Sequence, residues 1–186
     1  AIAYIAELQT PRFPRTTFTV GTVTGGTSVN SIAADATFAI DMRSNNSESL
    51  AIFERQAKQA ALTAVLEENS RWDSDAIAVR FNLIGDRPVG STSVESPIVQ
   101  VAAGAYAELG VDIGGITISS TDSNVPMALG IPAITISGGG DGGGAHSPAE
   151  WFKPVNSFLG PQAVLINILT LVGISGVSTP VLTDDF

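Results

Sequence analysis

The sequence has no cysteine and only one histidine among its 186 residues. Without cysteine the chain forms neither disulfides nor thiolate metal sites, so any metal would have to be held by imidazole and carboxylate groups. Basic residues are also few, with 9 Lys and Arg against 18 Asp and Glu, which gives a formal net charge of −9. Because this charge opposes binding to phosphate polymers, we expect no nucleic acid partner.

Charged residues make up only 15% of the chain and apolar residues 44%, a composition that excludes a disordered tail. Long uninterrupted apolar runs are missing too, because glycine, proline and asparagine break the stretch 155–182. We therefore expect a buried terminal helix there and no membrane contact. The segment Ala1–Leu8 lacks the basic start of a signal peptide, and we expect a cytoplasmic protein.

The first half of the chain alternates between strand and helix patterns. The residues 34–43 alternate apolar and polar, and an apolar stripe at 50, 53, 57, 61 and 64 follows helical spacing. We expect a helix at 1–9, strands at 16–23 and 34–43, a helix from an N-cap at Ser47 to near Asn69, and a strand at 76–84. One more strand in front would complete a ferredoxin-like βαββαβ sandwich.

The second half repeats helix and apolar strand, which is typical of a doubly wound α/β domain. Ser96 and Pro97 fit the N-cap and first turn of a helix whose apolar stripe runs from Ile98 to Leu109. Strands are expected at 114–119 and 131–137, and we place a domain boundary near residues 88–95.

The single histidine, His146, follows the run Gly138–Gly144, which contains six glycines. A histidine on a loop at the end of a strand of an open α/β sheet is placed where such sheets bind ligands, and imidazole is the commonest metal ligand. An ordinary hydrogen-bonded loop residue is the simpler explanation. The glycine run could also cradle phosphate, but no Gly-Lys-[Ser/Thr] follows it.

Three other polar positions could contact a ligand. Asp122 lies at a predicted strand-to-helix junction, where Thr121 or Asp122 could equally be a helix cap. Asn30 and Arg43 bracket a predicted hairpin and could together hold a carboxylate, Arg43 through its two-pronged guanidinium. A turn residue and an exposed strand residue explain them equally well.

Five segments in this order resemble the dizinc metallopeptidase family that includes tripeptidase T, glutamate carboxypeptidase, aminoacylase and succinyl-diaminopimelate desuccinylase. The segments are Gly25–Ile32, Asp41–Ser44, Thr121–Asn124, Gly130–Ala133 and Gly143–Trp151. They span nearly the whole chain, and their co-occurrence is more specific than any one of them.

The resemblance implies an α/β fold in which a ferredoxin-like lid is inserted into a doubly wound catalytic domain. Residues 1–87 would be the lid without its first strand, and residues 88–186 the C-terminal part of the catalytic domain. The lid would form a homodimer. By the same resemblance His146 matches a zinc ligand, Asn30 and Arg43 hold the substrate carboxylate, and Asp122 and Gly144 contact the substrate.

Such an enzyme uses two zinc ions and an activated water to cleave the amide bond of a peptide or an N-acyl amino acid. The resemblance implies that the other zinc ligands and the general base precede Ala1, so we expect the chain by itself to be inactive. Two alternatives stay open. One is an oligomerisation or peptide-binding module without catalysis, and the other is a phosphate- or nucleotide-binding α/β protein.

Overall fold

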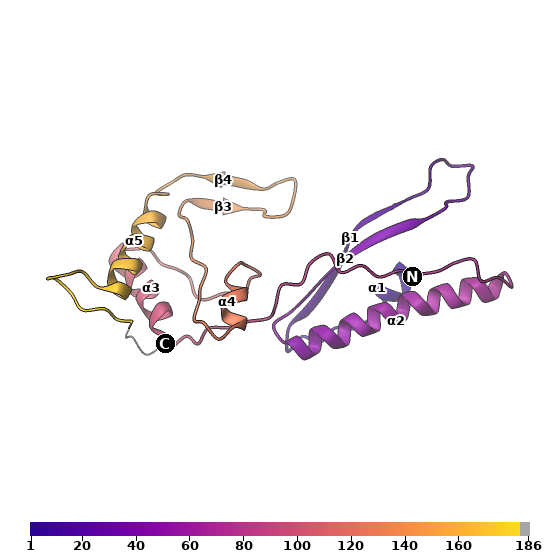
Figure 1. Cartoon of the computed structure of the whole chain (residues 1–186). Helices are drawn as coiled ribbons and strands as arrows, with labels where there is room; N and C mark the ends of the chain where they lie inside the picture. Colours follow the sequence, from indigo (N-terminus) through magenta and orange to yellow (C-terminus); the bar gives the residue numbers. More distant parts are fainter. Residues whose placement is uncertain (183–186) are drawn as a thin grey trace. The chain divides into compact units, whose positions relative to one another are not determined.

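A computed structural model describes residues 1–182 and divides the chain into two compact units, Ala1–Val89 and Gly90–Phe186 (Figure 1). The elements, in chain order, are α1 (Ile2–Ala6), β1 (Thr16–Gly25), β2 (Ala36–Ser44), α2 (Ser47–Arg71), α3 (Pro97–Glu108), α4 (Asn124–Ala128), β3 (Asp141–Gly143), β4 (Trp151–Lys153) and α5 (Leu159–Val172). Helices and small antiparallel sheets thus confirm the mixed α/β class. The assignment of residues 1–87 to a lid and 88–186 to a catalytic domain stays a prediction.

The first unit is a β-hairpin packed on a long helix. Strands β1 and β2 pair antiparallel from Thr16 opposite Ser44 to Gly25 opposite Ala36, and the register shifts between Val20 and Thr22. The face of the hairpin that packs on α2 carries Phe18, whose ring centroid lies 4.7 Å from that of Phe53. Both strands were expected from their alternating pattern, and both are confirmed within two residues at each end.

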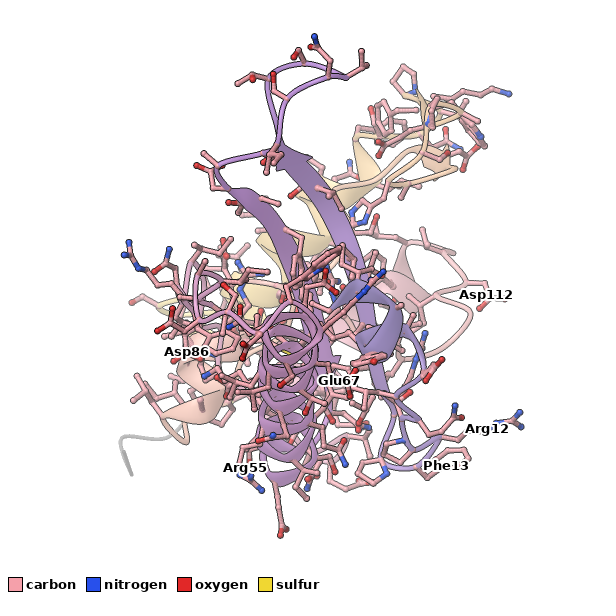
Figure 2. The ribbon with its side chains drawn as sticks, turned by 90° about the vertical axis from the view of Figure 1, so that its right-hand side faces the viewer. Arg12, Phe13, Arg55, Glu67, Asp86 and Asp112 are labelled. Atoms are coloured by element: carbon pink, nitrogen blue, oxygen red, sulfur yellow. The ribbon has the colours of Figure 1, made fainter. Side chains whose placement is uncertain are left out.

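Helix α2 buries one stripe of its surface, formed by Phe53, Ala57 and Ala61. The predicted apolar stripe is therefore correct, but the predicted N-cap is wrong by one residue. Asn46 is the N-cap, because its side chain accepts a hydrogen bond from the backbone N–H of Ser49 at 2.8 Å. Arg55 projects from the outer side of the same helix into solvent (Figure 2).

The N-terminal helix α1 is shorter than the nine residues expected, and Ile5 anchors it in the core. Its Tyr4 hydroxyl donates a hydrogen bond to the Glu67 carboxylate of α2. This hydrogen bond and the negative charge of Glu67 raise the pKa of Tyr4 above its ordinary value. The contact ties the two helices together at the surface.

The strand expected at 76–84 is not formed. The segment instead runs back along α2, where the Asn69 side-chain amide accepts from the Ile77 N–H at 3.1 Å and donates to the Ile77 carbonyl at 2.9 Å. Farther along, the Lys58 ammonium lies 5.8 Å from the centroid of the Phe81 ring. A side chain thus satisfies backbone groups that a neighbouring strand would otherwise bind.

The second unit is organised around α3 and α5, which pack against each other. Ser96 is the N-cap of α3 and Pro97 its first residue, as predicted. The buried residues at this contact are mostly alanines, which allow close approach: Ala102, Ala105 and Ala163. The nearby Tyr106 hydroxyl donates to the Ser137 carbonyl at 3.0 Å.

Strands at 114–119 and 131–137 are absent, so the doubly wound sheet that we expected is not assembled within residues 1–182. Ile116 and Ile118 are 66% and 72% exposed, which shows that no second segment covers them there. The Ala133 N–H and carbonyl bind the Thr92 hydroxyl at 3.0 and 2.6 Å rather than a strand. The described strands of this unit are β3 and β4, paired antiparallel.

The terminal helix that we expected across 155–182 is α5, which is shorter and buries one side only, with Gly160, Ala163 and Asn167 inward. Val164, Leu165 and Ile168 face solvent and are 40%, 56% and 51% exposed. Within residues 1–182 no helix is long and apolar enough to span a bilayer.

Asn167 carries a buried carbonyl oxygen that has no hydrogen-bond partner among the described residues. Its amide nitrogen donates to the Ala163 carbonyl at 2.8 Å, which leaves Oδ1 facing the interior. An unsatisfied buried acceptor costs about 1–3 kcal/mol. Replacing it with an apolar side chain of similar size should therefore increase stability.

We predict that Asn167→Leu raises the free energy of unfolding by about 1 kcal/mol in urea titrations followed by circular dichroism. Gln162→Leu, at an exposed position of the same helix, is the matched control and should change stability by less than about 0.5 kcal/mol. A loss of stability in Asn167→Leu would show that Oδ1 has a partner in solution.

Candidate functional site

The β3–β4 hairpin presents the only histidine of the chain at its closed end. Gly143 pairs with Trp151, and the residues 144–150 between them form a tight loop. Ser147 closes this loop, since its N–H and its hydroxyl both donate to the Gly144 carbonyl, at 3.1 and 2.7 Å. The Ser147 hydroxyl also accepts from the Ala149 N–H at 3.2 Å.

His146 is exposed and has a φ of 63°, in the left-handed region that residues other than glycine rarely adopt. Such conformations cluster at ligand sites and persist only where the surrounding structure enforces them, as the Ser147 hydrogen bonds do here. His146 therefore lies on a loop, as predicted. Its role as a metal ligand stays a prediction.

A zinc centre needs three or more protein ligands, and no three His, Asp or Glu side chains converge within residues 1–182. The residues that the structure describes therefore do not by themselves fit a zinc ion. No catalytic step is assigned to them.

Glycines in and near the run before His146 allow neighbouring groups to pack closely against the backbone. A Cβ on Gly143 would lie 2.8 Å from Nε1 of Trp151, whose ring covers this residue. Similarly, a Cβ on Gly160 at the start of α5 would lie 2.1 Å from the backbone of Gly138. The close packing of the Trp151 ring on Gly143 and of helix α5 on Gly138 explains why glycine is present here. A phosphate ligand is not needed to explain it.

A cavity of about 520 Å³ opens beside the His146 loop. Its lining residues come from both strands of the hairpin and from the loop: Gly142, Gly143, Ala145, Glu150, Trp151 and Phe152. The Lys153 ammonium lies 5.1 Å from the centroid of the Trp151 ring. No sequence pattern predicted this cavity, although the tryptophan that follows the glycine run was an available signal.

Arg43 lies on β2, opposite Thr17, with its side chain 53% exposed. Its Nε donates to the Asp41 carboxylate, two residues earlier on the same face of the strand. The Nη groups have no partner among the described residues and keep their donors for a second carboxylate. Arg43 could therefore bind an anion without giving up its ion pair.

Asn30 lies in the loop 26–35 at the tip of the same hairpin. Its Oδ1 accepts from the Ser28 hydroxyl at 2.8 Å. Since Arg43 is seven residues along β2 from Ala36, the two side chains are separated by about 23 Å of strand. The structure does not bring Asn30 and Arg43 together within one copy of the first unit.

Asp122 precedes α4, and its carbonyl accepts from the Val125 N–H at 3.4 Å. Helix α4 starts at Asn124 after Ser123, whose side chain makes no cap hydrogen bond. The Asn124 side chain reaches back and accepts from the Thr121 N–H at 2.9 Å. The cap at Thr121 or Asp122 stays a prediction.

The first unit matches a known family model. Residues 1–69 match the model of the M20 peptidase dimerisation domain. The match covers just over a third of the chain and includes α1, the β1–β2 hairpin and nearly all of α2. The first unit is therefore similar to a dimerisation domain of M20 peptidases. No curated protein matches the chain.

Gly144 is a predicted substrate contact, and its backbone conformation and close surroundings also require a glycine. It has a φ of 66°, and a Cβ would lie 2.6 Å from the Ala149 carbonyl oxygen. We predict that Gly144→Ala lowers the free energy of unfolding by more than about 1 kcal/mol in thermal or urea melts.

The matched control is Gly104→Ala on α3, where a Cβ meets no atom within 4 Å. This change should increase stability by about 0.5–1 kcal/mol, because alanine favours helix more than glycine does. Equal effects of the two changes would contradict the described geometry of the His146 loop.

Proposed function

We propose that the chain is part of a zinc-dependent peptidase or N-acyl amino acid amidohydrolase that assembles as a homodimer through its first unit. The observation that carries this proposal is the match of residues 1–69 to the peptidase dimerisation domain. The five sequence segments that resemble the dizinc metallopeptidases support it, since two of them lie in the matched region and three in the second unit.

In this proposal His146 is a zinc ligand and Arg43 and Asn30 bind the substrate carboxylate. Asp122 and Gly144 contact the substrate. The exposed, hydrogen-bonded loop position of His146 and the unengaged Nη donors of Arg43 support these roles. The remaining zinc ligands and the general base would come from outside these 186 residues, and the chain alone would be inactive.

A second candidate is an oligomerisation or peptide-binding module without catalysis. The dimerisation match favours it equally, and the described residues hold no group of three metal-ligating side chains. The two candidates agree on assembly and differ on zinc. Assembly and zinc binding are therefore separate properties, and each can be measured without the other.

Assembly is tested by sedimentation equilibrium of the whole chain. We expect a species of twice the 19.1 kDa of one chain, with an equilibrium that shifts toward it as concentration rises. A single species of 19.1 kDa at every concentration would contradict the assignment of the first unit.

Zinc binding is tested by isothermal titration of the chain and of His146→Ala. One imidazole without converging carboxylates should bind zinc only weakly, and His146→Ala should abolish that binding. Asp112→Asn, in an exposed loop of the same unit, is the control and should leave it unchanged. Weak binding that survives His146→Ala would reject the proposed ligand role, and tight binding would reject the proposal that the other zinc ligands lie outside these residues.

A further inference from the structure

The cavity beside the His146 loop, which we call the Trp151 cavity, has the size and composition of a small-molecule site. Its volume of about 520 Å³ lies within the range of about 300–1,000 Å³ that is typical of ligand pockets. Five of its six lining residues are apolar or glycine, namely Trp151, Phe152, Ala145, Gly142 and Gly143, and Glu150 is the charged one. An apolar group is therefore the part of a ligand that fits this wall.

Trp151 is held in place before any ligand arrives. One side of its ring rests on Gly143, where a Cβ would lie 2.8–3.0 Å from three ring atoms. The Lys153 ammonium lies 5.1 Å from the ring centroid, at cation–π distance. The side chain is nevertheless 46% exposed, so part of a large, oriented apolar surface faces the cavity and solvent.

An oriented aromatic ring of this kind binds apolar groups at low entropic cost, because the ring is not immobilised further on binding. Phe152, 63% exposed, also lines the cavity, and its ring packs against Gly140 while the Trp151 ring packs against Gly143. Gly143 contributes by its small size, since a Cβ there would collide with the Trp151 ring and displace it.

The cavity is also close to the candidate metal ligand along the chain. His146 follows Ala145 and precedes Glu150 in one loop, and both of these neighbours line the cavity. A ligand that reaches the imidazole with one group could therefore place an adjacent side chain in the cavity.

We propose that the Trp151 cavity binds an aromatic or branched apolar side chain of a peptide or N-acyl amino acid, and that Trp151 determines this preference. This inference rests on the proposed function for the class of ligand. It adds the kind of side chain that the ligand carries and the residue that selects it.

The chain has two tryptophans, one in each unit, which gives a direct readout. The variant Trp72→Phe keeps Trp151 as the sole tryptophan, and its emission can be followed during titration with N-acetylphenylalanine. We expect a saturable blue shift, with an affinity at least about ten-fold higher than for N-acetylglycine, which lacks the side chain. No saturable response, or equal affinity for the two compounds, would overturn the proposal.

A cavity-filling variant tests the location without removing Trp151. Ala145→Leu, made in the Trp72→Phe background, should reduce affinity for N-acetylphenylalanine at least about ten-fold. Ala107→Leu, at an exposed position of α3, is the matched control and should bind as the parent does. Equal binding by both variants would overturn the proposal, provided that their circular dichroism spectra agree.

The outcome is separable from that of the proposed function. The proposed dimer forms through the first unit, and the cavity lies in the second unit. A chain that dimerises in sedimentation but does not bind N-acetylphenylalanine therefore rejects only this inference. A monomeric chain that binds it rejects only the dimer.

Discussion

Backbone pairing is the constraint on which the rest of this structure depends, because an extended segment forms a strand only where a second segment meets it. The β1–β2 hairpin supplies its own neighbour and forms nine residue pairs, with one register shift between Val20 and Thr22. The segment 76–84 has none, and a side-chain amide of α2 binds its backbone instead. The chain accordingly exposes 13675 Å², against about 10,000 Å² for two compact units of half its mass.

The elements that the sequence predicts well are those specified by local signals. The alternation along β2 and the stripe of Phe53, Ala57 and Ala61 on α2 report a face that the hairpin and helix bury against each other. Pro97 likewise marks the start of α3. Where several polar residues compete for one role, the pattern fails by a residue, as it does for Asn46 and Ser47.

Long-range features could not be derived in the same way. The strands expected at 114–119 and 131–137 have suitable residues, but periodicity does not say which segment would pair with them. At the candidate site, the loop position of His146 follows from its glycine-rich surroundings. The separation of Asn30 from Arg43 and the Trp151 cavity depend instead on register and on cross-strand packing.

The central claim is that the first unit carries the self-association of a peptidase, and its location can be measured by hydrogen exchange with mass spectrometry. The chain is compared at concentrations below and above the association midpoint. The account predicts that added protection appears within residues 1–69 and that peptides from Gly90 onward exchange equally in both samples. Added protection confined to the second unit, or none at all on association, would contradict it.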